Sequence, residues 1–169
     1  MQVQRNFPSV IFSILIIKCQ ALPGIDNNNG VYLAASSFTA GWPGAEVQRS
    51  TDGLSYSNVS TLTTQATMGT ATNVPATGAA GFWDTASDLN VRIIAGALSS
   101  TSRDEPTYAA WGVNGRYEIV AFTTATQNTD GSWEVSGIAR GLRDTFAAVD
   151  AHAIGDHFII LSPAALGRV

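Results

Sequence analysis

Turn-forming residues recur along the whole chain at short and even intervals, and this spacing limits the fold more than any other feature. Intervals of about ten residues leave room for short strands, exclude long helices, and are typical of β-sandwiches and β-barrels. Four of these turns contain Pro23-Gly24, Pro43-Gly44, Asp52-Gly53 and Asp130-Gly131.

Between the turns lie segments rich in β-branched and aromatic residues, which pack well on a pleated sheet. Asp52-Gly53 joins two short extended segments and predicts a hairpin. Residues 63–81 are expected to form a loop or a weak strand, and short helical segments are expected near residues 101–110 and 146–153. Strands are expected at residues 31–35, 46–50, 56–62, 89–94, 116–122, 132–138 and 157–161.

The predicted fold class is therefore mainly β, an antiparallel β-sandwich or barrel-like domain with short helical segments. A glycine-rich stretch near residue 80 suggests a division into two β subdomains. The expected organisation is an apolar strand or leader-like segment at 1–20, subdomains at 21–80 and 81–162, and a tail at 163–169.

The apolar run at residues 10–17 permits two interpretations. Arg5 before it and Cys19-Gln20-Ala21 after it resemble a secretory signal peptide over residues 1–21, which would make the protein secreted. The β-branched residues of the run, bracketed by Pro8 and Pro23, instead favour a buried strand. The run is shorter than the roughly 20 apolar residues that a membrane-spanning helix needs.

Charge excludes several classes of partner. Only 13% of the residues are charged, and the formal net charge is −4. A chain without a basic stripe is not expected to bind nucleic acid or an anionic membrane surface. Cys19 is the single cysteine, so no internal disulfide can form.

The two histidines, His152 and His157, raise the question of a metal site with Asp150. Their spacing of five differs from the i, i+4 spacing of helical metal ligands. The favoured interpretation is a turn centred on Gly155, in which Asp156 accepts backbone N–H bonds. No metal or cofactor is expected, and no phosphate-binding or nucleophile-elbow motif occurs in the sequence.

Glycoside hydrolysis would require a pair of carboxylates, and Glu46, Glu118 and Glu134 are candidates. Their spacing selects no pair, and all three lie on expected strands where they are predicted to face solvent. We therefore expect no catalytic residues. A secreted β-fold hydrolase remains an alternative that would need both a signal peptide and such a pair.

Two further groups of residues are candidates for binding. Aromatic side chains suit both a sugar-stacking face and a core, so Trp42, Trp83, Trp111 and Trp133 are candidates for contact with a glycan or for packing.

The densest charge cluster is formed by Arg140, Arg143 and Asp144. They suit either an interface with another chain, where the arginine fork pairs well with carboxylates, or a local ion pair in a loop.

Several segments resemble, in the same order, the late portion of the large tail-tip proteins of siphophages and gene transfer agents, called megatron, host-specificity or hub proteins. The similarity covers about residues 20–162. Arg143-Asp144-Thr145 departs from the family pattern, which often has Arg-Gly-Thr there. The segments are 30–35 (GVYLAA), 49–56 (RSTDGLSY), 82–87 (FWDTAS), 91–100 (VRIIAGALSS), 116–125 (RYEIVAFTTA), 137–145 (GIARGLRDT) and 151–158 (AHAIGDHF).

The resemblance implies a structural component of a phage tail tip or baseplate hub, located in the virion and acting in tail assembly and host attachment. Other tail proteins would be its partners, and hubs of this kind are commonly threefold symmetric. No catalytic residue is carried over with the matched segments. The alternative from composition is a carbohydrate- or receptor-binding β-module that contacts a glycan on the host surface.

Overall fold

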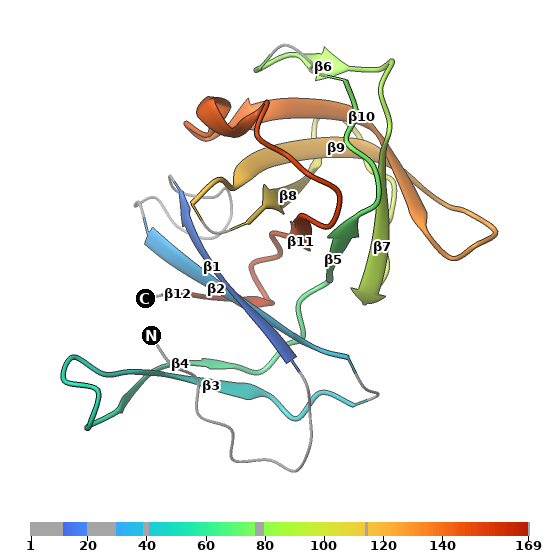
Figure 1. Cartoon of the computed structure of the whole chain (residues 1–169). Coiled ribbons are helices and arrows are strands. Elements are labelled where there is room, and N and C mark those ends of the chain that lie inside the picture. Colours follow the sequence, from blue (N-terminus) through green and yellow to red (C-terminus); the bar gives the residue numbers. More distant parts are fainter. Residues whose placement is uncertain (1–11, 20–29, 39–40, 77–79, 114, 169) are drawn as a thin grey trace.

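A closed antiparallel barrel forms the largest part of the protein (Figure 1). The computed structural model describes residues 12–19, 30–38, 41–76, 80–113 and 115–168. Strand β10 pairs with both β9 and β7, and this double pairing closes the ring of six strands. In spatial order the barrel strands are β7 (Leu89–Ala95), β5 (Met68–Ala71), β11 (His157–Ile160), β8 (Thr107–Gly112), β9 (Glu118–Gln127) and β10 (Trp133–Leu142).

Two further layers cover one side of the barrel (Figure 1). The first is a sheet in which β2 (Gly30–Ser37) lies between β1 (Phe12–Cys19) and β12 (Leu166–Arg168). The second is the hairpin of β3 (Ala45–Arg49) and β4 (Ser57–Leu62). The short strand β6 (Trp83–Asp84) pairs with the second half of β10, outside the ring.

Strand β2 is buried on both faces, because its side chains alternate between two layers. Tyr32 and Ala34 pack with Ile119 and other outward-facing residues of the barrel. Leu33 and Ala35 pack with Val47 and its neighbours in the hairpin. These two apolar clusters attach the outer layers to the barrel, together with hydrogen bonds from Gln65 and Ala66 to strand β2.

The barrel interior is filled by side chains and is not a channel. Trp111, Phe122 and Phe158 are fully buried there, and the rings of the two phenylalanines lie 6.0 Å apart. The other buried members of this cluster are Ala71, Leu89, Val91, Leu98, Ala109, Val120, Val135 and Ile138.

The predicted fold class is confirmed, and the barrel is the form that it takes. The hairpin predicted around Asp52-Gly53 is also present, since β3 pairs with β4. Residues 12–17 of the apolar amino-terminal run lie in strand β1, while residues 10 and 11 lie outside the described residues. Within residues 63–81, the expected weak strand corresponds to β5.

Both helical predictions need correction. Residues 101–110 contain no helix, because Pro106 interrupts the segment and the β-forming residues after it begin β8. Near residues 146–153, one short 3₁₀ turn, η1 (Phe146–Ala148), is the only helical element. No helix in the described part of the chain is long and apolar enough to cross a bilayer.

The layers do not follow the expected subdomain boundaries. The barrel takes β5 from the amino-terminal side of residue 80, and the expected tail contributes β12 to the sheet beside β2. Because antiparallel pairing joins strands that are distant in sequence, a glycine-rich stretch can lie within one architectural unit.

Candidate functional site: a buried charge network

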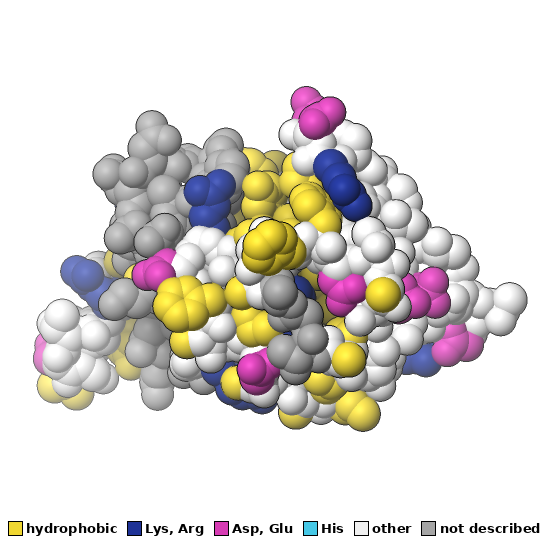
Figure 2. Space-filling model, turned by 90° about the horizontal axis from the view of Figure 1, so that it is seen from above, with side chains coloured by type: hydrophobic (Ala, Val, Ile, Leu, Met, Phe, Trp, Pro, Cys, Tyr) yellow, Lys and Arg dark blue, Asp and Glu magenta, His cyan; other side chains and the backbone are white. Residues whose placement is uncertain are grey.

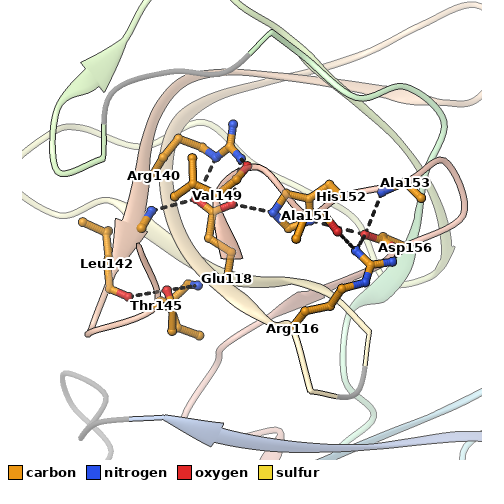
Figure 3. A network of polar contacts seen from close by, with 12 residues as sticks. Arg116, Glu118, Arg140, Leu142, Thr145, Val149, Ala151, His152, Ala153 and Asp156 are labelled. Carbon is orange, nitrogen blue, oxygen red and sulfur yellow. Dashed lines mark hydrogen bonds and ion pairs between the residues drawn. The ribbon is translucent and has the colours of Figure 1, made fainter. Parts of the chain in front are cut away.

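A network of charged side chains lies at the end of the barrel where β9 begins (Figure 3). At its centre is Glu118, the first residue of β9, with 0% of its surface exposed. Arg140 of the neighbouring strand β10 makes a two-pronged ion pair with it, from Nε to Oε1 at 2.7 Å and from Nη2 to Oε2 at 2.8 Å. The backbone N–H of Gly141 donates to Oε1 at 2.7 Å.

His152 links Glu118 to a second carboxylate, that of Asp156. Figure 3 shows the imidazole between the two, with Nε2 at 2.6 Å from Glu118 Oε2 and Nδ1 at 3.3 Å from Asp156 Oδ2. Both ring nitrogens therefore lie within hydrogen-bond distance of a carboxylate oxygen. The His152 side chain is fully buried.

Asp156 is paired in the same manner as Glu118. Arg116 donates from Nη1 and Nη2 to its two carboxylate oxygens, both at 2.6 Å. The backbone N–H of Ala153 donates to Oδ2 at 3.0 Å and closes the turn that contains Gly155. The turn predicted at this position, with Asp156 accepting a backbone N–H, is therefore present.

Trp111 of β8 forms one wall of the network. The His152 ring stacks on it with centroids 3.6 Å apart and planes at 9°, and the Arg140 guanidinium lies 4.8 Å from its ring centre. The Arg140 guanidinium thus contacts the negative face of an aromatic ring, an arrangement that is stronger when water is excluded.

The surroundings keep both carboxyl groups ionised. Burial raises the pKa of Glu118, but hydrogen bonds from His152 and Arg140 outweigh burial, and the pKa lies below its ordinary value of 4.5. For Asp156, burial again raises the pKa, but the hydrogen bonds from Arg116 and Ala153 outweigh burial and bring the pKa below its ordinary value of 3.8. The ion pairs are therefore fully formed at neutral pH.

The same contacts fix the loop between β10 and β11. Arg140 Nη2 donates to the carbonyl oxygen of Val149 at 2.7 Å, and Arg116 donates to that of Ala151. Thr145 Oγ1 donates to the carbonyl of Leu142 at 2.6 Å and accepts from the backbone N–H of Ile119 at 2.8 Å. The loop is therefore attached to the barrel at three successive points.

Glu118 and Asp156 have little capacity left for a substrate. An ionised carboxylate has about four lone-pair sites, and each of these two has four protein nitrogens within hydrogen-bond distance. The one buried side-chain nitrogen or oxygen without a partner among the described residues is Trp111 Nε1. The arrangement is suited to holding segments together rather than to transferring protons to a bound molecule.

The charge cluster expected at an interface is divided by the fold. Arg140 is an internal cation, with 4% of its side chain exposed. Arg143 is partly exposed and lies 5.9 Å from the Tyr108 ring centre, and Asp144 is exposed. Both have positive φ, 55° and 63°. Asp144 thus occupies, at the position where the tail-tip family often has glycine, a conformation that aspartate tolerates better than most residues.

The four tryptophans do not form one exposed face. Trp111 is fully buried, whereas Trp42, Trp83 and Trp133 are partly buried. Trp42 Nε1 donates to the carbonyl of Thr63 at 3.0 Å, and Arg103 lies 5.3 Å from the Trp83 ring centre. The packing alternative therefore holds for Trp111, whose ring no glycan can reach.

The prediction that Glu118 faces solvent is wrong. The alternation of the strand indicated that Glu118 is buried. Glu118, Val120 and Phe122 share one face of β9, and the last two are in the barrel core. Regarding metals, no group of three or more His, Cys, Asp and Glu side chains within the described ranges has the arrangement of a metal site.

Most of the barrel sequence matches a known family. The profile of a family described as Rcc01698-like, C-terminal, matches residues 66–159. The chain belongs to this family. The match runs from just before β5 to Ile159 in β11, so the Rcc01698-like C-terminal region includes the other five barrel strands, most of β11 and the whole charge network. No curated protein matches the sequence.

Proposed function

We propose that the chain is a structural component of a phage tail tip or baseplate hub, present in the virion and acting in tail assembly and host attachment. One observation carries the proposal. The segments that resemble tail-tip proteins, 116–125, 137–145 and 151–158, supply the side chains of the buried network: Arg116, Glu118, Arg140, His152 and Asp156.

This convergence supports a structural role over an enzymatic one. The shared residues are used to fix a loop against a barrel, and their donors and acceptors are paired inside the protein. A catalytic group must reach a reacting atom, and the Glu118 and His152 side chains are fully buried. A rigid module whose loop is fixed against the barrel suits a protein that contacts other chains in an assembly.

An exposed apolar surface beside the network supports assembly with other tail proteins. Phe82 is 72% exposed and Phe146 is 63% exposed. They flank Gly141, since Gly81 donates a backbone hydrogen bond to Arg140 and a Cβ on Gly141 would lie 3.0 Å from both Ala80 Cβ and Phe146 Cα. Figure 2 looks down on this face and shows hydrophobic side chains near its centre. Exposed apolar surface that is contiguous often marks a protein interface.

The experiment that tests the proposal begins with the DNA flanking the gene, which identifies the phage or particle to purify. Gradient-purified particles are then labelled with an antibody against this chain. We expect label at the distal end of the tail and the chain in the particle proteome. Particles that are complete without the chain would contradict the proposal.

A matched pair of variants tests the apolar surface. We expect Phe82→Ser with Phe146→Ser to reduce incorporation into particles, whereas Leu54→Ser, at the tip of the β3–β4 hairpin and 87% exposed, should not. Equal circular dichroism spectra of the three purified proteins would show that incorporation, and not folding, has changed. Equal incorporation of both variants would exclude this surface as the assembly contact.

A further inference from the structure

We propose that a polar cleft beside the β9–β10 hairpin binds a neutral carbohydrate. The cleft has a volume of about 620 Å³ and is lined by eight residues, none of them apolar. That volume falls within the range of about 300–1,000 Å³ that is usual for small-ligand sites. One wall is the hairpin end, from Gln127 to Asp130 with Ser132, and the other is formed by Thr72, Asn73 and Asn90.

The lining selects for a ligand rich in hydroxyl groups. It offers side-chain amides, hydroxyls and a single carboxylate. Each amide presents a donor and an acceptor, as does each hydroxyl, which matches the paired hydroxyls of a sugar ring. An apolar ligand would gain little here, because no apolar side chain lines the cleft.

The charge of the cleft argues for a neutral ligand. Asp130 is its only charged lining residue, and Arg92 lies 3.4 Å from it, so the two charges balance. Hydrogen bonds from Ser132 hold the pKa of Asp130 below its usual range, which keeps it an acceptor at neutral pH. On the side of the molecule where the hairpin projects, Figure 2 shows only a few acidic and basic side chains among white surface.

Both walls are fixed before any ligand arrives. Asn73 accepts from the backbone N–H of Asn90 at 2.7 Å and donates to the carbonyl of Asp88 at 3.0 Å. On the hairpin, Asp130 accepts two hydrogen bonds from Ser132, and Asn128 donates to the Ser132 hydroxyl at 3.1 Å. A site held in place loses less freedom on binding than a flexible loop does.

Other groups in the cleft remain available. Within the part of the chain that the structure describes, the side chains of Asn90, Gln127 and Thr129 make no hydrogen bond. They line the cleft from both walls and are the donors and acceptors that a sugar would use. Because the lining contains no aromatic ring, we expect weak binding at each site, which a threefold assembly would strengthen through avidity.

The test is a two-dimensional amide NMR titration of the full chain with a panel of neutral sugars: glucose, galactose, mannose, N-acetylglucosamine and their disaccharides. Each is used at about 10 mM, tenfold above a dissociation constant of about 1 mM. We expect at least one to shift the amides of Thr72, Asn90 and Asn128–Ser132. Gln127→Ala with Thr129→Ala should weaken that binding about tenfold, the loss expected for two neutral hydrogen bonds.

Thr124→Ala is the matched control, since Thr124 is an exposed residue of the same hairpin outside the cleft. It should leave the affinity unchanged. The proposal is overturned if no sugar shifts these amides, if the shifts centre on Trp42 or Trp83, or if the double variant binds as tightly as the control. The inference rests on the cleft alone, and the titration needs no tail protein, so it is independent of the test of assembly.

Discussion

Two aspartates close glycine-containing turns in this protein, and their surroundings differ sharply. Asp52, at the tip of the β3–β4 hairpin, accepts backbone N–H bonds from Leu54 and Ser55, each at 2.8 Å. Asp156 accepts one from Ala153 at 3.0 Å. Asp52 is exposed and takes its remaining hydrogen bond from Ser50, whereas Asp156 is buried and paired with Arg116 and His152.

The comparison separates a local from a global role for the same motif. Backbone hydrogen bonds are the largest influence on the pKa of Asp52 and lower it to about 2. At Asp156 burial is the largest single influence and raises the pKa, but the hydrogen bonds and the charge of its partners together outweigh burial and lower the pKa. Asp52 orders one loop in water. Asp156 belongs to a network that includes two barrel strands, so removing its carboxylate should lower the stability of the whole domain.

The largest expected effect is at the centre of that network. Glu118→Ala leaves Arg140 and His152 buried without their carboxylate, and breaking a buried pair in this way typically costs about 3–5 kcal/mol. We expect the free energy of unfolding, from urea denaturation, to fall by that amount. Glu46→Ala, an exposed site on β3, is the control and should change it by less than about 0.5 kcal/mol. Similar values for both would show that the network contributes nothing to stability.

The next effect is at the edge of the network. Asp156→Ala removes the partner of Arg116, whose side chain is 31% exposed and can turn to water. His152 retains its bond to Glu118. We therefore expect a smaller loss, about 2–3 kcal/mol, in the range for hydrogen bonds to charged groups. Urea denaturation measures it, and a loss larger than that of Glu118→Ala would place the centre of the network at Asp156.

Acid should weaken the network. The pKa values of Glu118 and Asp156 are lowered in the folded state, so the unfolded chain takes up protons first as the pH falls. The stabilisation is complete above the ordinary values of 4.5 and 3.8 and is lost as the pH falls through the lowered values. We expect urea midpoints to decline from pH 5 to pH 3, and the decline to be shallower in Glu118→Gln. Parallel profiles of the two proteins would contradict this assignment.

The sequence predicted the parts of the fold that depend on neighbours in the chain. The hairpin at Asp52-Gly53 and the turn at Gly155 follow from local turn chemistry, which acts over two to four residues. Most strands were similarly accessible, since β-branched and aromatic residues gather between the turns. The exceptions are β8, where a helix was expected, and β9 and β10, which continue to Gln127 and Leu142, beyond their expected ends. The closure of the barrel was not, because β10 pairs on both edges and no local pattern specifies its second partner.

The charge network escaped prediction for the same reason. Glu118 and Arg140 are 22 residues apart, and Glu118 and His152 are 34 apart. Arg140 stands beside Arg143 and Asp144, which made it resemble a surface residue. The alternation of β9 put Glu118 on the core face, and a buried carboxylate requires a buried cation. That reasoning would have led to Arg140, which shares a face with Ile138 on the next strand.

The smallest expected effect returns to the exposed aspartate. Asp52→Ala removes the acceptor of three hydrogen bonds, yet each donor can bond to water instead, so the urea midpoint should hardly move. The change should appear in hydrogen exchange, as faster exchange of the Leu54 and Ser55 amides. The amides of Ala153 and Ile119, which bond to Asp156 and Thr145, serve as the internal control and should keep their rates. A global loss of protection in this variant would mean that the hairpin tip stabilises the barrel. The two aspartates would then differ in burial, but both would contribute to the stability of the whole domain.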